Sequence, residues 1–194
     1  MKFKPNNFYH VFNRGNNKQK LFFHDENYQF FLRKIGNYLC PNCRVIAYCL
    51  MPNHFHLLIY VENVTNLPSG TMQILERKIG TMQSSYTRAI NIQEKRTGSL
   101  FQAKCKVLEV STEHAAACFH YIHKNPLKAE LCRSLEAWTH SSFNEYLDPD
   151  TCEKCICHKE IAYNVLAISA IKEIFLMQTS KDIIGKNIMD ILTK

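Results

Sequence analysis

The sequence predicts an α+β fold, a ferredoxin-like sandwich with a central antiparallel sheet, helices on the faces of that sheet and a C-terminal helical extension. The first basis for this prediction is the order of the periodic segments, which runs strand, helix, strand, strand, helix, strand. The second is composition, because 46% hydrophobic and 21% charged residues in a chain of 194 are typical of a globular core. Composition changes at Asp148-Pro149-Asp150, so we expect a main domain over 1–147 and the extension over 148–194.

Three of the expected strands lie in the first third of the chain. Residues 8–12 are apolar and aromatic, and an Asn-rich and Gly-containing turn follows them. Asp25 can cap a helix over 26–39, in which apolar residues recur at helical spacing. Two apolar runs, 45–50 and 54–61, flank Met51-Pro52-Asn53 and predict a hairpin.

The second half of the chain predicts mainly helices. A long amphipathic helix is expected over 71–92, with a basic loop after it and a fourth strand over 100–110. A further helix over 112–125 should end near Asn125, because proline at 126 disfavours helical geometry in the residue before it. Surface turns are expected up to Tyr146, and a helical tail over 160–192 should pack one apolar face on the main domain.

The chain is basic, with 24 Lys and Arg against 17 Asp and Glu, a net charge of +7 and a pI near 8.9. A polyanionic partner fits this balance without being identified by it. The N-terminal residues lack the apolar core of a signal peptide, and no apolar run reaches membrane-spanning length. We therefore expect a cytoplasmic protein without a membrane partner, whose nine cysteines are reduced thiols or metal ligands rather than disulfides.

His54 and His56 are the first candidate functional residues. Side chains alternate along a strand, so the two imidazoles should lie on one face while Phe55, Leu57 and Ile59 point to the other. Paired neutral imidazoles suit a divalent metal if an oxygen ligand joins them. Two histidines stacked along a strand for structural reasons give the same pattern, so the pair alone leaves both interpretations open.

Tyr121 is the second candidate. Helical spacing places its hydroxyl and the amide of Asn125 on one face, one turn apart. A tyrosine can act as a covalent nucleophile, but its ordinary pKa of about 10 requires activation by a cation or a base. An amphipathic tyrosine followed by an Asn that caps the helix would look the same in sequence.

Four motifs occur together in the order MPNHFH (51–56), GSLFQ (98–102), YIHKNPLK (121–128) and WTHSSF (138–143). This joint pattern resembles the single-tyrosine HUH transposases of insertion sequences, and is most similar to their REP-associated tyrosine transposase branch. The resemblance covers residues 5–147 and is more specific than any one motif. It implies a ferredoxin-like core in which Tyr121 is the nucleophile and His54, His56 and Asn125 hold the metal, expected to be Mg²⁺ or Mn²⁺.

The implied reaction is the cleavage and rejoining of single-stranded DNA at or near hairpins through a 5′-phosphotyrosine. Basic and aromatic residues could hold phosphates or stack on bases. The candidates for this role are Arg14, Lys18, Arg88, Lys95, Arg96, Phe101 and Lys104, with Tyr9 and Tyr86 as further stacking candidates. The sequence leaves monomer and homodimer both open.

Two other functions fit parts of the same pattern. An HUH enzyme that nicks replication or plasmid origins would use the same metal pair and tyrosine on a different substrate. A catalytically silent DNA-binding regulator would keep the fold, and the intact set of His54, His56, Tyr121 and Asn125 argues against it.

Cysteine spacing offers a separate hypothesis. Cys40 with Cys43 and Cys152 with Cys155 form two CxxC pairs, and Cys157 with His158 follows, so a tetrahedral zinc site is conceivable. More than a hundred residues separate the pairs, and we favour free thiols.

Overall fold

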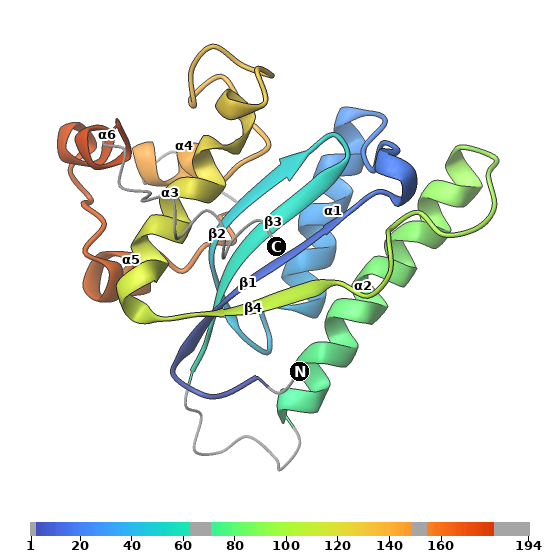
Figure 1. The fold of residues 1–194 in the computed structure, drawn as a ribbon, viewed down its shortest axis with the longest axis horizontal. Helices are drawn as coiled ribbons and strands as arrows, with labels where there is room; N and C mark the ends of the chain where they lie inside the picture. The colour runs from blue at the N-terminus through green and yellow to red at the C-terminus, as the bar shows by residue number, and fades with distance from the viewer. Residues whose placement is uncertain (1–2, 63–70, 149–154, 181–194) are drawn as a thin grey trace.

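The computed structural model of this chain describes residues 3–62, 71–148 and 155–180. Its elements are β1 (Asn7–Arg14), the short 3-10 helix η1 (Asn16–Lys18), α1 (Asp25–Tyr38), β2 (Arg44–Met51), β3 (His54–Val61), α2 (Thr71–Gln93), β4 (Lys106–Val110), α3 (Thr112–Lys128), α4 (Phe143–Leu147), α5 (Lys159–Leu166) and α6 (Lys172–Ser180). Figure 1 shows a twisted sheet at the centre with helices on both sides.

The four strands form one antiparallel sheet in the order β2-β3-β1-β4. β2 and β3 form the predicted hairpin, in which Met51 pairs with His54 across a turn of two residues. β1 lies between β3 and β4, so the start of the chain is inserted between segments that follow it by more than forty and about a hundred residues. This order is that of the ferredoxin-like fold, and the predicted fold class is confirmed.

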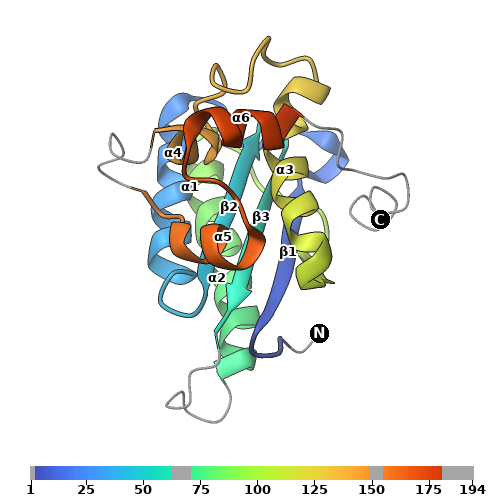
Figure 2. The ribbon, with the colours of Figure 1, turned by 90° about the vertical axis from the view of Figure 1, so that its left-hand side faces the viewer.

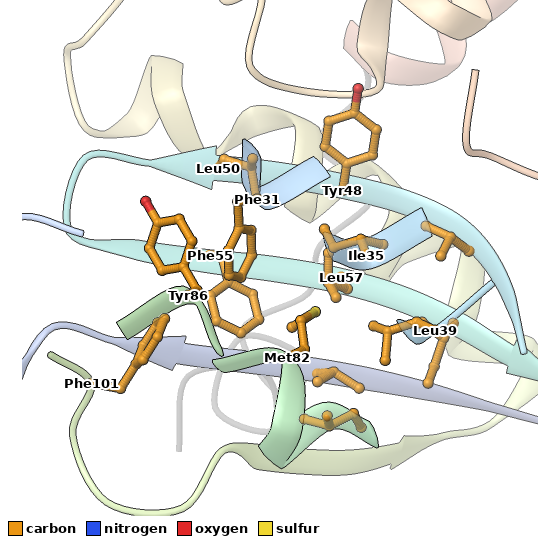
Figure 3. Close-up of a cluster of buried hydrophobic side chains, with 14 of the residues drawn as sticks. Phe31, Ile35, Leu39, Tyr48, Leu50, Phe55, Leu57, Met82, Tyr86 and Phe101 are labelled. Atoms are coloured by element: carbon orange, nitrogen blue, oxygen red, sulfur yellow. The ribbon is translucent and has the colours of Figure 1, made fainter. Parts of the chain in front are cut away.

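The sheet separates two hydrophobic cores. α1 and α2 cover one face, where Phe31, Met82 and Tyr86 meet Phe55 and Leu57 of β3 (Figure 3). α3 covers the other face, and α4, α5 and α6 lie on the same side as α3 (Figure 2). The predicted alternation along β3 therefore holds, with its apolar side facing α1 and α2 and its histidine side facing α3.

The C-terminal extension shares the second core. Ala162 of α5 and Phe175 of α6 are fully buried with Phe119 of α3 and Phe143 of α4. In the described part of the predicted helical tail over 160–192 there are two helices, α5 and α6, because Ala167 adopts a left-handed backbone with φ of 54° and ends α5. The predicted apolar face from Ile183 to Leu192 lies outside the described residues.

Two further predictions of element bounds were wrong. The fourth strand begins at Lys106, because Phe101 turns its ring into the core and only forms an isolated bridge with Gly15. The expected surface turns before Tyr146 include the short helix α4. None of the helices in the described ranges combines the length and apolar character needed to cross a membrane.

Helix α3 also differs from expectation, because it continues through Pro126 to Lys128. A proline inside a helix leaves the carbonyl four residues earlier, here that of Ile122, without its usual donor. The Asn125 side chain compensates, since its Nδ2 donates to the backbone oxygens of Tyr121 at 2.8 Å and Ile122 at 3.4 Å.

Candidate active site

The candidate site lies between β3 and α3, on the sheet face opposite to α1 and α2. His54 and His56 project from β3 with ring centroids 5.1 Å apart. The Tyr121 ring on α3 approaches His56 edge to face, with a centroid distance of 5.7 Å. The fold thus brings together residues that are more than sixty positions apart in the chain.

Both histidines use the same ring nitrogen for a contact within the protein. The Nδ1 atom of His54 lies 2.7 Å from Oδ1 of Asn53, and Nδ1 of His56 lies 2.9 Å from Nε2 of His10. Within the described part of the chain, the Nε2 atom of neither residue forms a hydrogen bond. Each imidazole therefore keeps one ring nitrogen available for a ligand.

The surroundings keep this pair uncharged. Burial, assisted by the nearby Arg14 guanidinium, lowers the pKa of His54 to about 4. Burial also lowers the pKa of His56 well below 6.5, with His10 and His54 adding to the effect. Neutral imidazole is the form that binds metals, so protons do not compete with a cation near neutral pH.

His10 was missed by the sequence reasoning. It is fully buried on β1, stacked on Phe12 with ring centroids 4.6 Å apart and on His56 at 5.1 Å. A signal did exist, because alternation puts His10 on one face of the first predicted strand, and a ferredoxin-like order makes that strand the neighbour of the histidine-bearing one. The register that brings the two residues together was not available from the sequence.

Tyr121 is 5% exposed, at the rim of the second core. Burial raises the pKa of Tyr121 above its usual 10.0, and a side-chain hydrogen bond with Asn125 lowers it in part. The Nζ of Lys128 lies 5.6 Å from the ring centroid. The phenol is therefore protonated at neutral pH, with a hydrogen-bonding amide and a cation close to it.

Asn125 follows Tyr121 by one helical turn, as predicted, and is partly exposed. Its two hydrogen bonds to the backbone of α3 use only the amide nitrogen. This places Asn125 beside the nucleophile candidate, and it also explains how the helix tolerates Pro126. The prediction that Asn125 caps the helix is wrong, because α3 continues to Lys128 and its C-cap is Ala129. The predicted role of Asn125 as a metal ligand stays compatible with its position.

Three cations surround the site. Arg14 pairs with His54 in the sheet register and lies within electrostatic range of it. Lys106 of β4 lies over the ring of Phe12, at 5.7 Å, and Lys128 lies over Tyr121. Only Arg14 was among the predicted DNA-binding residues. Lys128 follows Tyr121 by seven positions, which is helical spacing, so that signal was present in the sequence.

Other predicted DNA-binding residues line a cavity of about 800 Å³ between α2 and the segment that leads into β4. Arg88, Arg96 and Lys104 contribute cations to its lining, which also includes the apolar residues Ile79 and Val107. Arg96 donates from Nη2 to Oε1 of Gln19 at 2.9 Å, and Lys104 forms an ion pair with Glu76. No histidine or tyrosine of the candidate site lines this cavity, which belongs to the α1 and α2 layer.

The remaining predicted DNA contacts divide into two kinds. Lys18 and Lys95 are exposed in turns with positive φ. Phe101 is 5% exposed and its ring packs near Phe31 and Phe55 (Figure 3), so its burial argues against stacking on a base. The same holds for Tyr9 and Tyr86, which are fully buried, and we leave all three aromatics out of the DNA surface.

The cysteines do not form the hypothetical zinc site in the part of the chain that is described. Cys40 and Cys43 are free thiols after α1, and Sγ of Cys43 donates to the Leu39 carbonyl at 3.5 Å. Cys155 is disulfide-bonded, which corrects the expectation of reduced thiols at this position, because pairing depends on Cα distances that sequence does not give. Cys152 lies outside the described residues.

Over the described ranges, no cluster of three or more His, Cys, Asp and Glu residues is arranged to hold a metal ion. The predicted set has a different composition, since it combines two imidazoles with the amide of Asn125. Both imidazoles are neutral and have a free Nε2, which is what a borderline divalent cation requires of nitrogen ligands. The donor set therefore fits such an ion.

Comparison with solved structures supports the fold. A REP-associated tyrosine transposase bound to a REP hairpin aligns with a TM-score of 0.56 and 16% identity, over 78% of this chain and 85% of that chain. A bacterial tRNA(His) guanylyltransferase-like protein, in complexes with ATP and with GTP, aligns at TM-scores of 0.44 and 0.43, with 11% and 14% identity. These alignments cover 78% and 82% of this chain and 75% and 72% of those chains. Their TM-scores are below 0.5, so they do not establish a shared fold.

No curated protein sequence matches the chain. The family model described as "Transposase IS200 like", however, matches residues 4–125. That range runs from before β1 to Asn125, so it contains the whole sheet, both histidines and the tyrosine. It also covers more than half of the sequence. The chain therefore belongs to the IS200-like transposase family.

Proposed function

We propose that this transposase cleaves and rejoins single-stranded DNA at or near hairpins, with Tyr121 as the nucleophile and a 5′-phosphotyrosine as the intermediate. The observation that carries the proposal is the approach of the Tyr121 ring to His56, with centroids 5.7 Å apart across the space between α3 and the sheet. A nucleophile candidate and two candidate metal ligands thus face one another in a family whose members transpose DNA.

The chemistry exchanges one phosphoester for another. In cleavage, the phenolic oxygen of Tyr121 bonds to phosphorus, the bond from phosphorus to the 3′-oxygen breaks, and that oxygen leaves as a 3′-hydroxyl after taking up a proton. In rejoining, a 3′-hydroxyl attacks the phosphotyrosine and releases the Tyr121 oxygen. Bond energy is conserved in the protein–DNA ester, so no external energy source is required.

Mg²⁺ or Mn²⁺ held by His54, His56 and Asn125 would polarise the scissile phosphate and stabilise its developing charge. The chain's own residues prepare the tyrosine. Asn125 hydrogen-bonds to it and Lys128 lies over its ring, and both favour the charged phenolate over the phenol. Arg14 and Lys106 add positive charge on the sheet side, where a phosphodiester would lie.

We further propose that Arg14, Lys18, Arg88, Lys95, Arg96 and Lys104 contact phosphates of the DNA. Arg88, Arg96 and Lys104 gather at one cavity, which is the grouping expected of a polyanion site rather than of scattered surface charge. The solved structure with the same fold is bound to a REP hairpin, and this supports a hairpin as the partner.

The test is covalent capture of DNA. The full chain is incubated with a library of hairpin-bearing single strands and Mg²⁺ or Mn²⁺, and adducts are separated under denaturing conditions. Because the proposed ester joins Tyr121 to a 5′-phosphate, a label at the 3′ end of the DNA should remain with the protein and a label at the 5′ end should be released.

Tyr121→Phe should form no adduct while it still binds the hairpins. Tyr60→Phe is the matched control, because Tyr60 lies on the same sheet face and, among the described residues, its hydroxyl makes a single long hydrogen bond, to Asn6 at 3.4 Å. An adduct in Tyr121→Phe would refute the assignment of the nucleophile. Hairpin binding without an adduct in the wild-type protein would instead identify a silent DNA-binding regulator.

A further inference from the structure

We propose that Asn53 and His10 are positioning residues that hold His54 and His56 in the tautomer with the proton on Nδ1, so that both Nε2 atoms are set to receive the metal. The inference rests on the proposed role of the two histidines as metal ligands. It adds two residues with a defined task, one in the hairpin turn and one on the neighbouring strand.

The argument for His54 follows from the chemistry of an amide. Oδ1 of Asn53 can only accept a hydrogen bond, so the His54 Nδ1 at 2.7 Å must be the donor and must carry the ring proton. The amide of Asn53 is itself oriented, because its Nδ2 donates to the Lys18 carbonyl at 3.4 Å. That orientation turns the oxygen, and not the nitrogen, towards the imidazole.

The Asn53 backbone is anchored as well. Its carbonyl accepts a hydrogen bond from the Gly15 N–H at 2.7 Å, which joins the hairpin turn to the end of β1. A Cβ added at Gly15 would lie 2.0 Å from the Gln19 carbonyl oxygen, so the tight loop from Gly15 to Gln19 requires glycine at its start. Gly15 therefore helps to fix the residue that orients His54.

For His56 the partner is an imidazole. The 2.9 Å contact between His10 Nε2 and His56 Nδ1 holds one proton, which either nitrogen can carry. If His56 donates, its Nε2 has a free lone pair. If His10 donates, neutral His56 carries its proton on Nε2 and cannot bind a metal there. Metal binding thus requires His10 to be the acceptor, with its own proton on Nδ1.

The position of His10 fits this task. It is fully buried, and the rings of Phe12 and His56 lie 4.6 and 5.1 Å from its own ring, so tight packing keeps the imidazole in place. Its Nδ1 has no hydrogen-bond partner among the described residues. Within that part of the chain, the imidazole of His10 therefore hydrogen-bonds only through Nε2, to His56. His10, His54 and His56 do not form a three-histidine metal cluster. The short contact is accordingly assigned as a hydrogen bond and not as shared ligation.

The first test measures Mn²⁺ affinity of the full-length, DNA-free protein by titration with detection of free Mn²⁺ by electron paramagnetic resonance. Mutation of a residue that orients a histidine ligand typically lowers the metal affinity by about 10- to 100-fold. We expect that loss for His10→Phe, which keeps a stacked ring without an acceptor, and for Asn53→Leu. His10→Gln and Asn53→Asp each keep an acceptor oxygen and should restore binding to within a few-fold of wild type.

The second test reads the tautomers directly. Long-range ¹H–¹⁵N spectra of the metal-free protein should show Nδ1–H for both His54 and His56, and Asn53→Leu should shift His54 towards Nε2–H. An Nε2–H tautomer of His54 or His56 in the wild-type protein would overturn the inference. So would a His10→Gln variant that binds Mn²⁺ as poorly as His10→Phe, since that result is expected of a direct ligand.

Different results would refute the metal assignment of His54 and His56 and the positioning roles of His10 and Asn53. If His54→Ala and His56→Ala bind Mn²⁺ as wild type does, the metal assignment in the proposed function is wrong. If these variants lose Mn²⁺ but folded His10→Phe and Asn53→Leu retain wild-type affinity, the metal site stands and the positioning roles are refuted. Thermal unfolding without metal establishes that each variant is folded.

Discussion

At the scale of single residues, the hydroxyl of Tyr121 is subject to two opposing effects. Burial raises its pKa, which keeps the phenol protonated, while the hydrogen bond with Asn125 lowers the pKa in part. The Lys128 ammonium lies 5.6 Å from the ring centroid, and we expect its charge to favour the phenolate as well. Activity should therefore rise with pH as the phenol becomes easier to ionise, and the position of that rise should depend on the cation.

Replacement of Lys128 tests this dependence. In Lys128→Ala the pKa of Tyr121 should rise further, so the rise of single-turnover adduct formation with pH should move to higher pH. An exposed pair of opposite charges contributes about 0.2–1 kcal/mol, which corresponds to about 1.4- to fivefold in rate. Lys128→Arg keeps the charge and should keep the profile. An unchanged profile in Lys128→Ala would show that this cation does not act on the tyrosine.

The sequence was informative about residues whose role depends on local periodicity. His54 and His56 share a strand face, and Tyr121 and Asn125 share a helix face, and both relations follow from spacing alone. The partners of these residues were not accessible in this way. His10 and Lys106 reach the site through strand pairing, and the register of β1 against β3 and β4 is a property of the folded sheet.

At the scale of elements, the motifs YIHKNPLK and WTHSSF are joined by a hydrogen bond between His123 and Ser142, and Ser142 also bonds to Tyr48. We call these three residues the clamp. The Ser142 hydroxyl lies 2.7 Å from His123 Nε2, accepts the Tyr48 N–H at 2.9 Å and donates to the Tyr48 carbonyl at 3.3 Å. His123 belongs to α3 and Tyr48 to β2. The segment after Trp138 therefore ties the helix that carries Tyr121 to the outer strand of the sheet.

Ser142→Ala should leave both a buried imidazole nitrogen and a backbone N–H without partners. We expect the free energy of unfolding to fall by about 1–3 kcal/mol, the usual cost of unsatisfied buried polar groups. Ser141→Ala is the control, because both Ser141 hydrogen bonds are 3.3 Å long and remain within its own turn. Chemical denaturation of the two variants measures the difference, and equal losses would contradict the clamp.

Element bounds were predicted well where one pattern dominated and poorly where tertiary contacts intervened. The strands β1 to β3 and the helices α1 and α2 follow their apolar spacing closely. Helix α3 passes the proline at which local rules end it, because Asn125 donates to the backbone carbonyl of Ile122, which Pro126 leaves without a partner. β4 begins late because Phe101 is drawn into the core.

At the scale of the whole molecule, the predicted boundary near residue 148 does not separate two cores. A chain ending at Leu147 would expose the apolar surface that Ala162, Leu166 and Phe175 cover. Burying one large apolar side chain contributes about 1.5–3 kcal/mol, so we expect this truncation to lower the melting temperature strongly or to aggregate. Truncation after Ser180 is the control, and the difference between the two proteins reports on residues 148–180. Equal melting temperatures would show that the extension does not support the core.

Charge distribution gives a second prediction at this scale. Arg88→Glu and Lys104→Glu should weaken binding of hairpin DNA and reduce the slope of log affinity against log salt, by about one for each phosphate contact that is lost. Lys172→Glu, an exposed change on α6, is the matched control for net charge. Fluorescence anisotropy at several salt concentrations measures both quantities. An effect no larger than that of the control would remove the cavity from the DNA surface.

The outer edge of β2 has a consequence for assembly. Residues 140–142 and 157–158 form backbone contacts along it, including the bridges Cys49–Ser141 and Val45–Cys157. Of the two sheet edges in the described part of the chain, that leaves β4 open for pairing. A filament built by strand addition needs two open edges on every copy, so growth through the sheet stops when two copies meet. The covered edge of β2 thus limits association through the sheet to two copies.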